Sequence, residues 1–192
     1  MIINLKCQCG KLKGQAFGPF RKKHSRAVCM CDDCQAYAHH LGQASEILDS
    51  NGGTEIIALY PDQIKLTDGV ENLKCLRLSS EGMFRWYAGC CHSAIANSAA
   101  PKLPFAGVVH TFIDLDEKEK DSIFGPVFVR FLAKYGNPPF PPNTYMKTPW
   151  ILIITTLPFI LKGFIKKKYL PSPFFQEDGT PKVEPQVLEP KV

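Results

Sequence analysis

Residues 29–34 read Cys-Met-Cys-Asp-Asp-Cys, and this stretch decides how the whole chain is interpreted. Two further cysteine clusters lie on either side of it, Cys7-Gln8-Cys9-Gly10 and Cys90-Cys91-His92. Thiolates spaced by one or two residues can bind one ion, because the turn between them brings both sulfurs to about 2.3 Å from a tetrahedral zinc. Neighbours this close rarely form a disulfide without strain. The clusters therefore indicate metal binding, with zinc favoured and an iron–sulfur cluster as the chief rival.

Seven of the eight cysteines are candidate metal ligands: Cys7, Cys9, Cys29, Cys31, Cys34, Cys90 and Cys91. The sequence predicts that they hold one or two Zn²⁺ ions. We take Cys31, from the middle cluster, as the candidate catalytic residue. The eighth cysteine, Cys75, lies alone in an alternating strand pattern, and we interpret it as a small buried hydrophobic residue.

The composition is that of an ordinary globular chain. Of its 192 residues, 45% are hydrophobic and 21% are charged, which excludes a wholly disordered or collagenous chain. The eight cysteines are about 4% of the residues, below the 8–10% typical of a disulfide scaffold. No apolar secretory signal precedes the first cluster. We therefore expect a reducing, cytoplasmic location, in which clustered thiols bind metal or take part in catalysis.

Charge is segregated along the chain. Residues 1–31 carry seven Lys or Arg and no acid, and residues 147–169 carry five lysines and no acid, whereas residues 32–146 have a net charge of −5. Such basic stretches fit a nucleic acid, a membrane surface, an anionic small ligand or merely a solvated turn. The sequence has no basic motif with interleaved aromatic residues, no helix-turn-helix pattern and no finger spacing with paired histidines. Nucleic-acid binding is therefore disfavoured.

Short β-prone runs separated by turn signals fill the first hundred residues, and one more follows shortly after. Strands are expected at residues 2–5, 26–29, 55–60, 64–67, 73–78, 83–87 and 108–113. Many short strands with frequent turns are typical of a mainly β fold with antiparallel sheets. We therefore expect a zinc-stapled antiparallel β-sheet domain over residues 1–118, followed by a helical extension over 119–170 and an extended tail over 171–192.

Helices are expected at three places. Asp32-Asp33 is expected to cap a short helix that ends at Gly42. A second helix is expected over about residues 122–135. A third begins with Thr148 as its N-cap and Pro149 as its first residue.

The third helix contains an apolar run from Trp150 to Leu161, interrupted by Pro158. A transmembrane helix needs about 20 apolar residues, so a membrane span is disfavoured. Two alternatives remain open. The helix packs on its own domain or on a second copy, or it makes weak, reversible contact with a membrane surface through Lys166-Lys167-Lys168.

The order of the clusters carries a family resemblance. Cys-x-Cys-Gly is followed by Cys-x-Cys-x-x-Cys, and then an aromatic strand beginning at Phe84 runs into Cys90-Cys91-His92-Ser93-Ala94-Ile95. This order resembles the glutathione-dependent formaldehyde-activating enzymes and centromere protein V, over roughly residues 3–115. The remaining extension, with Pro173-Phe174-Phe175, looks more like an uncharacterised branch of that superfamily than like the enzymes themselves.

The resemblance implies a β-rich fold with two zinc sites. A structural site would join the first and last clusters: Cys7, Cys9, Cys90 and Cys91. A second site, associated with activity in the enzymes, would use the middle cluster and leave a fourth position open: Cys29, Cys31 and Cys34. The family usually ends its pattern with Cys-x-x-Cys, but Ala88 stands here where the first of these cysteines belongs. His92 is therefore an alternative to one of the two adjacent cysteines.

A zinc ion with three thiolates and one open position has the layout of a catalytic site. The implied activity is that of a carbon–sulfur lyase acting on an adduct between an aldehyde and glutathione or another small thiol. Such a ligand is anionic, so we expect nearby bases to attract it: Arg21, Lys22, Lys23 and Arg26. The alternative is a non-catalytic zinc-stabilised binding or scaffold module.

Overall fold

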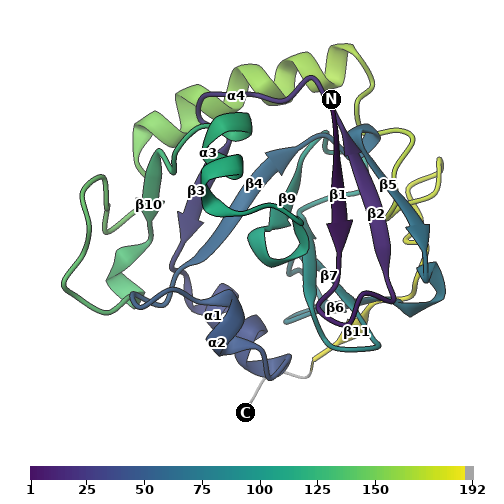
Figure 1. Cartoon of the computed structure of the whole chain (residues 1–192), viewed down its shortest axis with the longest axis horizontal. Coiled ribbons are helices and arrows are strands. Elements are labelled where there is room, and N and C mark those ends of the chain that lie inside the picture. Colours follow the sequence, from purple (N-terminus) through teal and green to yellow (C-terminus); the bar gives the residue numbers. More distant parts are fainter. Residues whose placement is uncertain (189–192) are drawn as a thin grey trace.

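The computed structural model describes residues 1–188 and confirms the mainly β fold class (Figure 1). A three-stranded antiparallel sheet has the order β1 (Ile2–Lys6), β2 (Lys13–Phe17), β5 (Ile64–Asp68). An eight-stranded sheet has the order β10 (Val129–Phe131), β3 (Arg26–Cys29), β4 (Thr54–Leu59), β9 (Ala106–Val109), β8 (Ala94–Ser98), β7 (Phe84–Ala88), β6 (Leu73–Arg77), β11 (Gln186–Val187). Only the edge strands of this larger sheet, β10 and β11, run parallel to their neighbours among the described residues.

Four α-helices accompany the sheets: α1 (Asp32–His40), α2 (Ala44–Ile47), α3 (Glu117–Phe124) and α4 (Trp150–Ile165). Single 3-10 turns lie at Pro61–Gln63, Val70–Asn72, His110–Phe112 and Ala133–Tyr135. Across residues 1–188, each helix falls short of the length or the apolar character that crossing a membrane requires.

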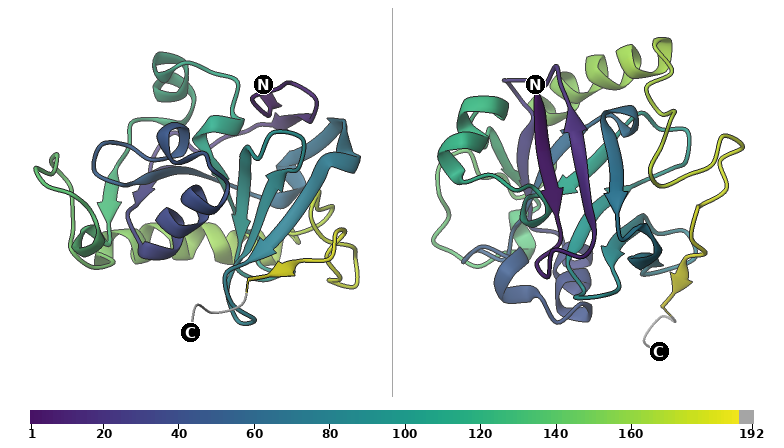
Figure 2. Two further views of the ribbon diagram at one scale, coloured as in Figure 1. Left: turned by 90° about the horizontal axis from the view of Figure 1, so that it is seen from below. Right: turned by 45° about the vertical axis from the view of Figure 1, so that its right-hand side comes forward.

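The main core lies between the two sheets. Alternate residues of the larger sheet, such as Ile57 and Val108, face the small sheet and pack with Leu5. Their sequence neighbours face the other way, where Val109 packs with residues of α1 and α2. This alternation is the period-two pattern of a strand that is buried on both faces. The small sheet therefore covers one face of the large sheet, and α1 and α2 cover the other (Figure 2).

The C-terminal segment returns to the main core. Phe174 is fully buried and stacks on Trp86 of β7, with the ring centroids 4.9 Å apart. Phe175 packs edge-on against the same indole. The predicted division at residues 118 and 170 remains a prediction, but β10 and β11, which follow residue 118, both join the large sheet. Residues 189–192 of the predicted tail lie outside the described residues.

Several expected elements differ from the structure. The helix predicted over residues 122–135 is wrong beyond Phe124, because Gly125 follows with a φ of +78° and Pro126 cannot continue a helix. Strand β10 and a 3-10 turn occupy the rest of that range. The strand predicted over 108–113 ends at Val109. Helix α4 begins one residue later than expected, with Pro149 at its N-cap.

Candidate metal centres

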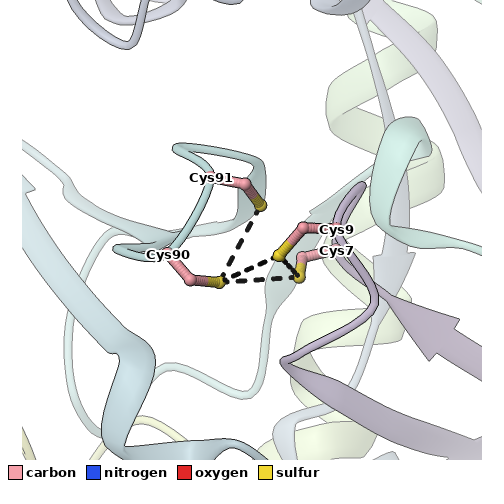
Figure 3. Close-up of side chains that lie close together, drawn as sticks. All are labelled: Cys7, Cys9, Cys90 and Cys91. Carbon is pink, nitrogen blue, oxygen red and sulfur yellow. Dashed lines mark hydrogen bonds between the residues drawn. The ribbon is translucent and has the colours of Figure 1, made fainter.

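Two turns on different sheets bring together Cys7, Cys9, Cys90 and Cys91, which we call the four-sulfur centre (Figure 3). The first pair lies in the turn between β1 and β2, and the second pair lies in the turn between β7 and β8. Their sulfur atoms all lie within 4.8 Å of one another, so they could hold a metal ion. The centre thus connects the small sheet to the large one.

The sulfur–sulfur distances are too long for disulfides and suit a shared ion. The Sγ of Cys9 lies 3.5 Å from that of Cys7 and 3.4 Å from that of Cys90. The Sγ of Cys90 lies 3.8 Å from that of Cys7 and 3.9 Å from that of Cys91. A disulfide requires about 2.05 Å. All eight cysteines of the chain, each within the described residues, are free thiols.

Backbone and hydroxyl groups surround the sulfurs with donors. The N–H of Leu12 donates to the Sγ of Cys7 (3.3 Å). The Oγ of Ser93 lies 3.2 Å from the Sγ of Cys91 and accepts a hydrogen bond from the N–H of Gln8 (3.0 Å). Burial alone would raise the pKa of the Cys91 thiol, but hydrogen bonds from Ser93 and neighbouring groups lower it to about 6. Ser93 therefore favours a thiolate at Cys91 and ties the two turns together, whereas burial and the neighbouring sulfurs raise the pKa of Cys90 to about 12.

The two adjacent cysteines of the last cluster both reach this centre. The chain turns sharply after them, because His92 adopts a left-handed backbone with a φ of +58° and its N–H donates to the carbonyl oxygen of Ala88 (2.7 Å). The imidazole of His92 is exposed and packs edge-on against Tyr87, outside the group of sulfurs. The structure therefore brings Cys90 and Cys91 to the first cluster, and it does not bring His92 there.

A second group, Cys29, Cys31 and Cys34, forms the three-sulfur centre where β3 passes into α1. Their ligand atoms also lie within 4.8 Å of one another, and the sulfurs of Cys29 and Cys31 are 3.3 Å apart. The N-cap of α1 is Cys31, although the sequence predicted that Asp32-Asp33 would cap this helix. The Sγ of Cys31 accepts a hydrogen bond from the N–H of Cys34 (3.4 Å). Local chain geometry alone thus brings these three sulfurs together.

A buried arginine lies beside the three-sulfur centre. Arg85 of β7 is 1% exposed, and its Nη1 lies 3.8 Å from the Sγ of Cys34. Its Nη2 lies 3.6 Å from a carboxylate oxygen of Asp33, while its Nε is buried without a partner among the described residues. Hydrogen bonds from Cys29 and Cys31, together with the charge of Arg85, hold the pKa of Cys34 well below its usual value. Arg85 therefore favours a thiolate at Cys34, whereas the neighbouring sulfurs raise the pKa values of Cys29 and Cys31.

The three-sulfur centre has no fourth ligand from the protein within residues 1–188. The group that converges there contains three cysteines and no His, Asp or Glu ligand atom from the described chain. Of the three cysteines, Cys29 and Cys34 are buried, whereas Cys31 is partly exposed. One side of the centre is therefore reachable from solvent.

The basic residues expected to attract a ligand lie elsewhere. Arg26 is 1% exposed and forms ion pairs with carboxylates of Glu55, Glu117 and Asp121, so its charge is already neutralised. The loop before it contacts α4, where the Nη2 of Arg21 donates to the carbonyl oxygen of Thr155 (3.1 Å). Because Arg26 begins β3 and Cys29 ends it, this loop lies at the far end of the strand from the three-sulfur centre (Figure 1).

Sequence reasoning missed Arg85 and Ser93. Arg85 stands in the strand expected over residues 83–87 and was given no role there, but it is buried in β7. Ser93 directly follows the last cluster, and this position next to predicted ligands could have indicated that its hydroxyl lies beside a sulfur. Cys75 is 2% exposed and lies outside both centres, as predicted.

Together these features define a mainly β protein with two cysteine centres that could hold metal ions. A family model described as a family of unknown function, DUF6151, matches residues 1–185, and the chain belongs to this family. No curated protein matches the sequence. One solved structure, a crystal structure of a Rhodobacter sphaeroides protein from a structural genomics programme, is 12% identical with a TM-score of 0.45; the match covers 65% of this chain and 97% of that one. So distant a likeness carries no argument about function.

Proposed function

We propose that the protein binds zinc at both centres, structurally at the four-sulfur centre and with an exchangeable fourth ligand at the three-sulfur centre. Four sulfurs bonded to one tetrahedral zinc at about 2.3 Å lie about 3.8 Å apart. Four of the six sulfur–sulfur separations at the four-sulfur centre are 3.4–3.9 Å, close to this value, and all six are within 4.8 Å. An all-sulfur tetrahedral set suits zinc, which supports zinc over harder metals such as magnesium.

The observation that carries the functional part of the proposal is the missing fourth ligand at the three-sulfur centre within the described residues. The partly exposed Cys31 marks the side from which an external ligand can enter. We propose that this ligand is a small thiol such as glutathione, and that the reaction is carbon–sulfur lyase chemistry on thiol–aldehyde adducts. The resemblance of the cysteine order to the formaldehyde-activating enzymes supports this choice.

The reaction is balanced without an oxidant or reductant. In the direction of synthesis, the thiol sulfur bonds to the aldehyde carbon, the carbonyl π bond opens, and the proton lost by the thiol ends on the new hydroxyl. Zinc bound at the centre would supply a Lewis acid and a site at which a thiol binds as its thiolate. The chain's own contribution is positive charge, because the guanidinium of Arg85 lies against Cys34 in a buried setting where charge interactions are strong.

Zinc analysis combined with thiol titration tests the proposal. We expect two zinc equivalents per chain, and calorimetry should show one bound glutathione per zinc-loaded chain. Cys31→Ser should lose both one zinc and the glutathione heat, whereas Cys75→Ser should keep both. Exchange between the glutathione–formaldehyde adduct and its free components, followed by NMR, should be faster with the parent protein than with Cys31→Ser. Two zinc equivalents without glutathione binding would instead favour the non-catalytic module.

The role of Arg85 can be separated from simple packing. Arg85→Lys keeps a positive charge near Cys34, whereas Arg85→Gln removes it. We expect Arg85→Gln to lower the zinc affinity of the three-sulfur centre about tenfold in a chelator competition, and Arg85→Lys to restore part of this loss. Equal loss in both variants, or equal loss at the four-sulfur centre, would show that Arg85 acts only through the fold.

A further inference from the structure

Helix α4 presents a row of large apolar side chains to solvent. Trp150, Ile154, Leu157, Leu161 and Ile165 are spaced three or four residues apart, so they share one face of the helix. Their exposed fractions range from 52% at Leu157 and Leu161 to 84% at Ile165. We call these five residues the α4 ridge. An exposed apolar patch of this kind marks an interaction surface on a folded protein.

The C-terminal half of α4 packs on the rest of the chain through the face opposite the ridge, and its N-terminal half lies over an apolar cavity whose rim includes Leu157 of the ridge. Phe159 is buried and stacks on the ring of Tyr60 with the centroids 4.0 Å apart. The hydroxyl of Tyr60 donates to the carbonyl oxygen of Phe159 (2.8 Å). Gly163 lies so close to Pro104 that any Cβ there would stand 2.6 Å from its ring. Helix α4 consequently lies along the outer edge of the molecule (Figures 1 and 2).

Positive charge gathers at the C-terminal end of the ridge. Lys162, Lys166 and Lys167 are exposed there. Arg21 lines the same groove as Lys162 and Lys166, and its Nη1 is buried without a partner among the described residues. In addition, residues 122–176 contain seven Lys or Arg and no Asp or Glu. The α4 ridge and the cations beside it are therefore complementary to a partner surface that combines an apolar layer with anionic groups at its border.

We propose that the α4 ridge docks on the surface of an anionic lipid bilayer, with α4 lying in the plane of the interface. The ridge would enter the boundary between headgroups and acyl chains, and the lysines would reach the lipid phosphates and carboxylates. Trp150 at one end of the ridge suits this depth, since tryptophan is enriched at membrane interfaces. A second copy of the chain fits less well, because each copy has a net charge of +5 and would bring the same lysines to the contact.

The chain carries its own fluorescent reporter for this contact. It has two tryptophans, of which Trp86 is fully buried and Trp150 is 78% exposed. Adding vesicles of phosphatidylcholine with about one third phosphatidylserine should shift the emission of Trp150 to the blue and sediment the full-length, zinc-loaded protein. Vesicles of phosphatidylcholine alone should bind at least about tenfold more weakly. No shift and no sedimentation with the anionic vesicles would overturn the proposal.

Matched variants assign the contact to the ridge and to the lysines. Ile154→Glu should abolish vesicle binding, while Val70→Glu, which adds the same charge at another exposed apolar position, should not. Lys166→Glu combined with Lys167→Glu should weaken binding more than about tenfold, and the paired control Lys65→Glu with Lys74→Glu should change it far less. Equal effects of test and control variants would overturn the proposal. So would a dimer, seen by sedimentation velocity without lipid, that Ile154→Glu dissociates.

Discussion

The two cysteine centres differ in how far apart along the chain their cysteines lie. The four-sulfur centre joins turns that are more than 80 residues apart and belong to different sheets. The three-sulfur centre draws all its sulfurs from six consecutive residues at the start of α1. Closing a long loop in an unfolded chain costs more entropy than closing a short one. An ion at the first centre therefore stabilises the tertiary structure, whereas an ion at the second fixes only a local turn.

The centres also differ in their chemical completeness. The four-sulfur centre supplies four candidate ligands from the protein, and Ser93 and the N–H of Leu12 lie against its sulfurs. The three-sulfur centre supplies three sulfurs and adds the charge of Arg85. Closed coordination is typical of structural zinc, and an open position is typical of reactive zinc. Under the function proposed above, the same residue type would serve stability in one centre and chemistry in the other.

The largest effect is expected from a substitution at the four-sulfur centre. Cys9 is exposed, so Cys9→Ser removes one ligand with little loss of packing. Because the binding free energy of a structural metal is also folding free energy, we expect the melting temperature to fall by about 10 °C or more. One zinc equivalent should be lost as well. Thermal unfolding and metal analysis measure both, and a normal melting temperature in a zinc-depleted variant would contradict the structural role.

Phe174→Ala should destabilise the chain without touching either centre. The ring is fully buried against Trp86, and truncating such a side chain typically costs about 3–5 kcal/mol. For a chain of this size the melting temperature should fall by about 10 °C. Zinc content in the cold should stay at that of the parent. If Phe174→Ala also lost zinc, the losses seen in cysteine variants would reflect general unfolding.

Cys31→Ser should separate the second centre from the first. Serine is a good N-cap, so the variant keeps the cap of α1 while it removes a ligand. We expect the loss of one zinc equivalent with a fall in melting temperature of no more than about 5 °C. Cys9→Ser is the matched comparison, since each variant replaces one thiol by a hydroxyl. Equal falls in the two variants would erase the distinction between the centres.

The sequence predicted the features that depend on residues close together along the chain. The three cysteines of residues 29–34 and the first turn of α1 follow from spacing within a few residues. The grouping of Cys7 and Cys9 with the last cluster came from a resemblance, because spacing cannot say which distant turns meet. Strands β2 and β8 were missed because Lys13–Phe17 and Ala94–Ser98 are rich in small and polar residues, which carry little β pattern.

Tertiary contacts account for the remaining differences. Leu132 adopts a left-handed backbone and Phe131 pairs with Cys29, so the chain expected as one helix is divided into a strand and a turn. The sequence could not predict the contact between Arg85 and Cys34, because the two residues lie on different elements, 51 residues apart. Pairing with a strand far along the chain can override local helical preference. These long-range effects set the surroundings of the sulfurs, although the sulfurs themselves were evident.

The smallest effect is expected at Cys75, the cysteine outside both centres. It is 2% exposed, and its Sγ lies 3.9 Å from the carbonyl oxygen of Leu76. Cys75→Ala should leave the zinc content unchanged and reduce the stability at pH 7 by about 1 kcal/mol. Metal analysis and urea unfolding measure the two quantities. A lost zinc equivalent would mean that Cys75 reaches a metal, contrary to its position.

The pH dependence of Cys75→Ala gives a second measurement. Burial raises the pKa of Cys75 from the ordinary value of 9.0 to about 12. Between these values the unfolded chain releases a proton that the folded chain retains, so the folded state loses stability as the pH rises. Below pH 9.0 the thiol is protonated in both states and this effect is absent. Stability measured by urea unfolding should therefore fall less steeply above pH 9.0 in Cys75→Ala than in the parent, and parallel curves would show that the thiol is accessible to water.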